Sequence, residues 1–310
     1  MSKNSDILDK ARARFGIDTR RFKVTPYFPA RLTLRRFNIT LVVSDGSIPF
    51  LPFGKSILLF MSPFTHVDGQ NFLTQTKLRF INHILCFSNY TKKYIDQEFG
   101  TKSQVIYPAV SPPSSTLPKQ NIILSVGRFT PMLHQKNQLF LVKTFIKFEK
   151  KLPDWKLVLV GGTEKGSDTL LKQIKTKAQG HSIDIKTDVT GKTLHHLYAQ
   201  AKLYWHAAGF GQNLAASPEK AEHFGISIVE AMGNGTVPLV FAAGGPTEIV
   251  TPQSGVLWRS QAELIRHTLT LVASDSRRLR LAAAAKKRAS FFNSDRFCQS
   301  VYALVNKTGK

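Results

Sequence analysis

The chain is poor in acidic residues, because 20 Asp and Glu stand against 43 Lys and Arg in 310 residues, for a formal net charge of +23. Such an excess favours anionic partners, whether phosphate groups, nucleic acid or an acidic membrane surface. The basic residues are spread along the chain, which is typical of a solvated surface, and the denser stretch 12–36 is the best candidate for a contact face. Aromatic residues are not interleaved with the basic runs, so we do not expect a nucleic-acid partner.

Cysteine and long apolar runs are also scarce. Only Cys86 and Cys298 occur, which fits a reducing cytoplasm and argues against a disulfide scaffold or a zinc site. We expect both to be small core residues. No run of about 18 apolar residues could span a membrane, and the polar first six residues lack the apolar region of a secretory signal. The sequence therefore predicts a cytoplasmic protein that could attach peripherally to the anionic inner face of a membrane.

What the chain does contain is an alternation of short β-branched runs and longer amphipathic segments. Its length predicts two domains, residues 1–118 and 119–310. The first half has expected strands at Ile39–Val43, 57–61, 83–87 and 104–107, and helices near 69–81 and at Asn89–Phe99. Ser88 is a plausible cap for the second of these helices. Residues 108–118 carry four prolines and are typical of a semi-rigid linker.

The alternation is cleaner in the second half. Strands are expected at 122–126, 156–160, 183–185, 203–206, Val237–Phe241 and Val256–Trp258, and helices at 136–150, 167–179, 193–199, Ile226–Gly233 and 261–271. This order predicts a doubly wound α/β fold with a parallel sheet, whose ligands bind beyond the carboxyl ends of the strands. Two terminal helices should follow, at 276–290 and 294–305. In the last one, Phe297, Val301 and Leu304 form a stripe that could dock on the first domain or cover the second sheet.

Two carboxylates stand out in the second half, Glu222 and Glu230, on either side of the turn Phe224-Gly225. The segment after this turn is apolar enough to be a buried helix. Burying Glu230 there without a hydrogen-bond or charge partner would destabilise the folded protein. A carboxylate held there could accept hydrogen bonds from vicinal hydroxyls, and the helix start could bind an anion. The alternative reading is a helix-capping Glu222 and a surface Glu230.

Further motifs follow other predicted strands. Gly127-Arg128 comes before Lys136, Gly161-Gly162 ends the next strand, and His206 ends the strand before the glutamates. Gly244-Gly245 and Glu248 come after them; we read Glu248 as a helix-start carboxylate. Together these motifs resemble the signature of family 4 retaining glycosyltransferases, which have the GT-B fold. The resemblance is good over residues 119–305 and looser over 38–118, and it implies two Rossmann-like domains.

The resemblance also implies roles for these residues. Arg128 and Lys136 would stabilise the diphosphate of a nucleotide-sugar donor, and Glu222 would contact the donor sugar near the reacting centre. Glu230 would bind the ribose hydroxyls. The remaining donor-binding candidates are Gly127, Gly162, His206, Phe224, Gly225 and Ile226. From its sequence context alone, His206 fits a satisfied structural histidine better than a site residue.

The resemblance further implies a UDP- or GDP-sugar as co-substrate, no required metal and no other cofactor. The acceptor would be a glycan or lipid-linked precursor of a cell-surface polysaccharide or glycolipid. The first domain departs from the family, because it is short and lacks an early strand followed by a Gly-rich loop. We therefore keep two alternatives to the transferase, a nucleotide-sugar-binding protein without transfer activity and a GT-B epimerase.

Overall fold

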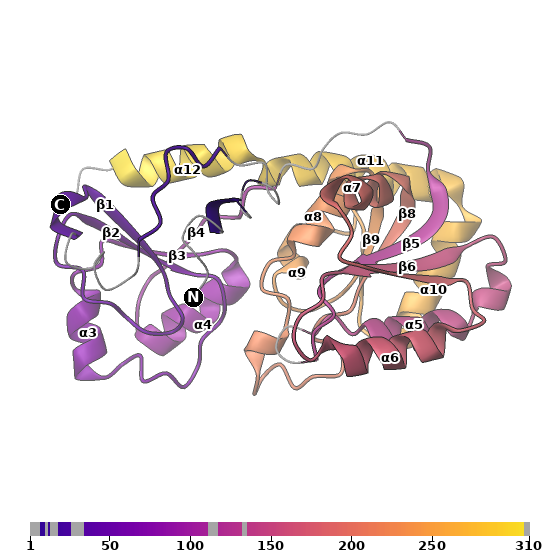
Figure 1. Cartoon of the computed structure of the whole chain (residues 1–310), viewed down its shortest axis with the longest axis horizontal. Coiled ribbons are helices and arrows are strands. Elements are labelled where there is room, and N and C mark those ends of the chain that lie inside the picture. Colours follow the sequence, from indigo (N-terminus) through magenta and orange to yellow (C-terminus); the bar gives the residue numbers. More distant parts are fainter. Residues whose placement is uncertain are drawn as a thin grey trace.

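The computed structural model describes residues 7–9, 12, 18–25, 34–110, 117–131 and 135–306. They form two α/β units, each built on its own all-parallel sheet, and Figure 1 shows the units side by side. The predicted fold class is therefore confirmed. Most of residues 10–15, at the start of the basic stretch, and much of the linker 108–118 fall outside the described residues.

The first unit has the strand order β1-β2-β3-β4. Its elements are η1 (Leu34–Arg36), β1 (Ile39–Val43), β2 (Lys55–Phe60), α3 (Phe72–Leu78), β3 (His83–Cys86), α4 (Asn89–Phe99) and β4 (Gln104–Val105). As predicted, the Ser88 hydroxyl caps α4 by accepting from the Thr91 amide, and Gly100 ends the helix in the left-handed region at φ 59°. Helix α3 is shorter than expected, because the Asn71 side chain caps it at Phe72.

The second unit has the order β10-β9-β8-β5-β6-β7, in which the strand order reverses between β5 and β8. Its strands are β5 (Gln120–Val126), β6 (Lys156–Gly161), β7 (Ile183–Thr187), β8 (Ala201–His206), β9 (Val237–Phe241) and β10 (Val256–Trp258). Its helical segments are α5 (Gln138–Ile146), η2 (Glu149–Lys151), α6 (Ser167–Ala178), α7 (Gly191–Gln200), η3 (Pro218–Lys220), α8 (Ile226–Gly233), α9 (Pro246–Ile249), α10 (Gln261–Ala273), α11 (Asp275–Ala289) and η4 (Ser290–Phe292).

Helices cover both faces of this second sheet. Alternate residues along β5 enter different cores, since Ile123 packs with α5, α6 and α10, whereas Leu124 packs with α7, α8 and α11. Strand β6 reads as the unbroken apolar run Leu157–Val160 because it is buried on both sides. Two buried layers hold the carboxyl ends of β5 and β8 next to each other.

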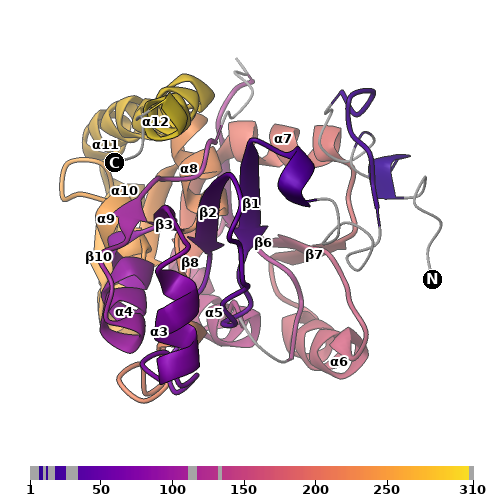
Figure 2. The same cartoon turned by 90° about the vertical axis from the view of Figure 1, so that its left-hand side faces the viewer.

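The last helix, α12 (Ser294–Asn306), crosses back to the first unit. Leu304, Phe297 and Val301 pack on Ile57 and Leu59 of β2, so the stripe docks on the first sheet and not on the second. Figure 2 shows α12 on one side of the first sheet and α3 and α4 on the other. Cys86 is buried as expected, but Cys298 is exposed, so the expectation of a core residue was wrong there.

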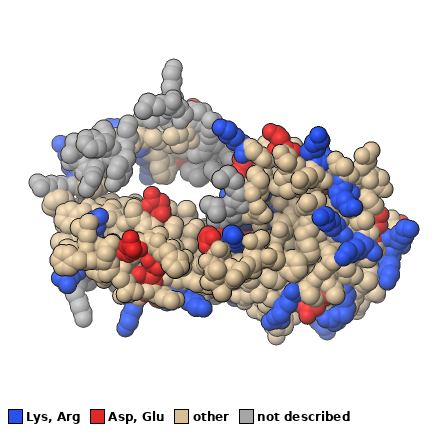
Figure 3. All heavy atoms as spheres, turned by 90° about the horizontal axis from the view of Figure 1, so that it is seen from below, with Lys and Arg blue, Asp and Glu red and all other residues tan. Residues whose placement is uncertain are grey.

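Positive charge is diffuse on one face of the protein. On the face drawn in Figure 3, Lys and Arg side chains are scattered over the larger unit and do not gather in one patch. Of the candidate contact face 12–36, only part lies within the described residues. Of the helices within the described ranges, none combines the length and apolar character that a membrane crossing requires.

Candidate active site

Three predicted site residues meet at the carboxyl ends of β5 and β8. The Glu222 carboxylate accepts hydrogen bonds from the Lys136 ammonium (Nζ–Oε2 2.5 Å) and from His206 (Nε2–Oε2 2.7 Å). The side chains are 16%, 18% and 3% exposed, respectively. Lys136 and Glu222 are 86 residues apart in the chain. We call these three residues the Glu222 cluster.

The cluster fixes the charge of its carboxylate. Burial by itself raises the pKa of Glu222, but the Lys136 charge and the His206 hydrogen bond outweigh it and hold that pKa well below its usual range. At neutral pH Glu222 is therefore ionised. It can accept further hydrogen bonds, but it has no proton to donate.

His206 is oriented by this contact. Its Nε2 bonds Glu222, whereas its Nδ1 is buried and has no hydrogen-bond partner among the described residues. A satisfied structural histidine would have both ring nitrogens bonded. The geometry thus favours the site-lining interpretation over the structural one that its sequence context suggested.

The segment 136–138 holds Lys136 in place. The Asn137 amide donates to the carbonyls of Ala207 (2.8 Å) and Phe210 (2.9 Å), beyond β8. Gln138 donates to the carbonyls of Gly127 (3.1 Å) and Arg128 (2.9 Å), beyond β5. We had assigned roles to neither residue, although their position next to Lys136 was a usable signal.

The glycines of this region are explained by close packing. A Cβ on Gly127 would lie 2.5 Å from Cγ of Lys136, so the missing side chain makes room for the lysine stem. A Cβ on Gly161 would lie 2.0 Å from the Gly127 carbonyl oxygen. Gly162, the residue we had chosen, is in ordinary contact only, with its nearest neighbour at 3.6 Å. Gly161 is therefore the glycine that packing requires here.

The turn before α8 leaves the helix start open. Gly225 has a φ of 114°, and no side chain among the described residues caps the helix. Ile226 is 52% exposed at this end. The Phe224 ring is buried against Tyr107 and Phe292, with centroids 5.8 and 5.5 Å away. Any contact of Phe224 with a ligand would therefore have to come from its backbone.

Glu230 lies in the middle of α8, half-buried, as its apolar neighbours predicted. Its carboxylate accepts a hydrogen bond from the Tyr198 hydroxyl of α7 (2.8 Å). Burial raises the pKa of Glu230, and the hydrogen bond only partly opposes this. Glu222 and Glu230 therefore differ in their electrostatics. Tyr198 was missed, because a tyrosine on an amphipathic helix gives no local sign of its partner.

Of Arg128, Lys136 and Glu222, the three residues predicted to act on the diphosphate and the sugar, Arg128 lies outside the cluster. Its side chain is 59% exposed and its guanidinium lies 3.4 Å from the Glu164 carboxylate. Exposed pairs of this kind contribute little to stability. The Arg128 side chain therefore retains the freedom to turn toward a ligand.

The Gly244-Gly245 turn supports the backbone of Glu222. The Gly245 amide donates to the Glu222 carbonyl (2.8 Å). A Cβ on Gly244 would lie 2.2 Å from that same oxygen, and one on Gly245 would lie 2.2 Å from the His223 oxygen. Only glycines fit so close to this segment, so the turn packs directly on the Glu222 backbone.

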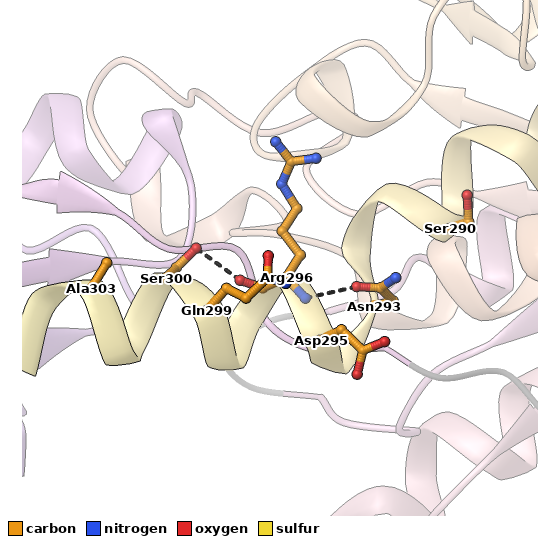
Figure 4. A pocket seen from close by; sticks show the side chains of 7 residues that line it. All are labelled: Ser290, Asn293, Asp295, Arg296, Gln299, Ser300 and Ala303. Atoms are coloured by element: carbon orange, nitrogen blue, oxygen red, sulfur yellow. Dashed lines mark hydrogen bonds between the residues drawn. The ribbon is translucent and has the colours of Figure 1, made fainter.

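Figure 4 shows a hollow of about 600 Å³ beside the junction of α11 and α12, away from the Glu222 cluster. Its lining comes from η4, α12 and the residue between them, including Asn293, which caps α12, and Arg296. The Arg296 guanidinium lies 3.7 Å from the Phe291 ring centre, so its charge is already engaged and we assign no ligand here. Within the described residues no group of three or more His, Cys, Asp and Glu could hold a metal ion; metal independence stays a prediction.

Comparisons with known proteins agree with this geometry. The family described as glycosyl transferases group 1 matches residues 110–288, which is more than half of the chain. A human protein named GDP-Man:Man(3)GlcNAc(2)-PP-Dol alpha-1,2-mannosyltransferase is 29% identical over 208 residues, 61% of this chain and 39% of that protein. A Mycobacterium tuberculosis protein named GDP-mannose-dependent alpha-(1-6)-phosphatidylinositol dimannoside mannosyltransferase is 28% identical over 140 residues, 45% of this chain and 34% of that protein. The matched regions thus span less than half of these relatives' own lengths.

Solved structures show the same fold. Anabaena HepE, crystallised with UDP, has a TM-score of 0.65 at 19% identity and covers 82% of this chain and 73% of its own. Sucrose-phosphate synthase from Thermosynechococcus elongatus has a TM-score of 0.68 at 16% identity, and the match covers 89% of this chain and 75% of that protein. Since the family match spans β5 to α11 and includes the whole Glu222 cluster, the chain belongs to the glycosyl transferases group 1 family and has the GT-B fold.

Proposed function

We propose that the protein is a retaining glycosyltransferase that moves a sugar from a nucleotide-sugar donor to a glycan or lipid-linked acceptor. The observation that carries this proposal is the Glu222 cluster, a buried, ionised carboxylate held by Lys136 and His206. The cluster lies at the carboxyl ends of β5 and β8, where the strand order reverses and where such sheets bind their ligands.

The leaving group of such a reaction is a nucleoside diphosphate, whose negative charge grows as the bond to the sugar breaks. Lys136 has three N–H donors, so it can donate to phosphate oxygens while it keeps its hydrogen bond to Glu222. Arg128 can turn in from the surface and offer a two-pronged contact. The open start of α8 adds backbone amides and the positive end of a helix dipole. Together these groups would supply the charge that a metal ion supplies elsewhere.

The two glutamates would act at different places along the donor. Glu222 would accept hydrogen bonds from sugar hydroxyls beside the reacting carbon and favour the positive charge that develops there. Glu230 would bind the ribose hydroxyls. Because Glu222 is ionised, we assign it no role as a proton donor.

The names of the relatives favour GDP-mannose as the donor and a lipid-linked glycan as the acceptor. The solved neighbour with UDP shares only the fold, so a UDP-sugar is the second donor to test. An acceptor on a lipid and a formal charge of +23 fit work at an anionic membrane surface.

Binding and transfer test the proposal together. In a calorimetric panel of GDP, UDP, ADP and their sugars, we expect one nucleotide family to bind and to raise the melting temperature by mass action. The same donor should lose its sugar to a lipid-linked acceptor or to water. Binding without transfer or hydrolysis would support the binding-protein alternative, sugar epimerisation would support the epimerase, and no binding at all would refute the site.

The Gly127→Ala variant tests the placement of Lys136. The added methyl overlaps the lysine stem, so the ammonium should leave its position and diphosphate affinity should fall about tenfold, through loss of a charge-assisted contact. Isothermal calorimetry with the nucleoside diphosphate and with the nucleoside measures this, and only the diphosphate should be affected. Gly191→Ala is the control, because nothing lies within 4 Å of its added methyl. Equal losses for both ligands would contradict the phosphate role.

A further inference from the structure

Glu248 connects the two units. It lies on α9 in the second unit, yet both of its carboxylate oxygens accept hydrogen bonds from the first. The backbone amides of Asn89 and Tyr90 donate to them (2.9 and 2.8 Å), as does the Asn89 side-chain amide (2.9 Å). The Tyr107 hydroxyl, from the segment between the units, adds a fourth bond (3.0 Å). The expectation that Glu248 serves only the start of its own helix was therefore wrong, since it caps a helix of the other unit.

This cap completes the start of α4. The Ser88 hydroxyl accepts a hydrogen bond from the Thr91 amide. Glu248 accepts hydrogen bonds from the amides of the two preceding helix residues, Asn89 and Tyr90. A carboxylate at this end of a helix also interacts favourably with the helix dipole. Because Ser88 remains as a cap, α4 does not depend on Glu248 in order to form. The contact acts between the units.

The backbone of α9 is fixed in turn to the Glu222 cluster. Four residues before Glu248, the Gly244-Gly245 turn packs directly on the Glu222 backbone. On the other side, Arg288 of α11 donates to the carbonyls of Glu248 (2.6 Å) and Ile249 (3.1 Å). A short, well-packed path therefore joins the start of α4 to Glu222.

A second contact repeats this connection from the other direction. The Tyr90 hydroxyl donates to the Pro218 carbonyl (2.9 Å), in the segment that leads into Glu222. The first turn of α4 thus touches the chain on both sides of Glu222, before it through Pro218 and after it through Glu248.

We propose that Glu248 is a positioning residue that sets how the first unit lies against the Glu222 cluster. The inference rests on the proposed function: the donor-binding groups all lie on the second unit, so the acceptor would bind on the first. Glu248 would touch neither donor nor acceptor. It would hold the first unit in the position that sugar transfer requires. Small displacements of the reacting groups from that position lower the reaction rate strongly.

Two variants weaken the contact from opposite sides, and Asn89→Pro leaves the Tyr90 and Tyr107 bonds to Glu248 in place. Glu248→Gln removes the charge and keeps the shape of the side chain. Asn89→Pro removes both Asn89 donors at the first position of α4, where proline is well tolerated. Glu263→Gln is the matched control, because that carboxylate also accepts from a backbone amide, that of Arg259 (2.7 Å), but within the second unit.

For both contact variants we expect nucleotide affinity within about twofold of the unmodified protein and a transfer rate, at saturating donor, at least about tenfold lower. A pair of dyes, one on each unit, should report a longer or broader distance. The losses should add incompletely in the double variant, since both changes weaken the same contact. Glu263→Gln should leave the rate and the distance unchanged.

Unchanged distance together with additive effects would overturn the proposal, as would a loss of nucleotide affinity equal to the loss of rate. Failure of the proposed function gives a different pattern: the unmodified protein then shows no nucleotide binding or transfer, while the dye distance and the double-variant analysis of unfolding still test the contact between the units.

Discussion

Replacing Glu222 with glutamine is expected to lower the turnover number about 100-fold or more, while nucleoside diphosphate affinity stays within about threefold. Glutamine keeps the shape of the side chain but removes the charge that Lys136 and His206 stabilise. An interaction made chiefly as charge develops at the sugar affects turnover and not ground-state binding.

Steady-state kinetics at saturating donor, together with calorimetry, separate these effects. Glu219→Gln is the control, since Glu219 lies in the same segment but its carboxylate is not part of the Glu222 cluster. The melting temperatures of both variants show whether the fold is intact. If turnover at saturation survives in Glu222→Gln, Glu222 does not act at the reacting centre.

Replacing Glu230 with glutamine should instead weaken donor and free nucleotide together. Loss of charge-assisted hydrogen bonds to the ribose corresponds to about 1.5–3 kcal/mol, or roughly 10- to 150-fold in affinity. Turnover at saturation should change little, because the lost contact exists before and during the reaction. Calorimetry with nucleotide, and with a 2′,3′-dideoxy analogue that cannot make the contact, measures this. Equal losses for both ligands would rule out the ribose role.

The pH dependence of binding gives a second readout for Glu230. Since burial raises its pKa, the carboxylate is ionised above that raised value and takes up a proton as the pH falls through it. Affinity should therefore decline at a pH above the ordinary glutamate value of 4.5, where Glu222 is still charged. Tyr198→Phe removes a hydrogen bond to the ionised form, so the decline should begin at a higher pH. Glu230→Gln should abolish it.

Local sequence signals determined most elements of the fold. Strands β1, β9 and β10 and helices α4 and α8 have the predicted bounds, because apolar spacing, the Ser88 cap and the turn at Gly225 act within a few residues. Alternation of strand and helix also predicted parallel sheets with a site at their carboxyl ends, since crossovers of one hand place all those ends together. The roles of Lys136, His206 and Glu222 came from the family resemblance, and the sequence context of His206 alone favoured a structural histidine.

Contacts between distant segments were decided by the tertiary structure alone. The apolar stripe of α12 fits either sheet, and only packing placed it on the first. Gly127 and Gly161 are glycines because other segments lie against them. Glu248 gave the local signal of a helix start, but its partners, Asn89 and Tyr90, are more than 150 residues away. The sequence specifies the chemical type of each side chain and favours its local backbone conformation. Which distant residue that side chain contacts depends on how the two units pack together.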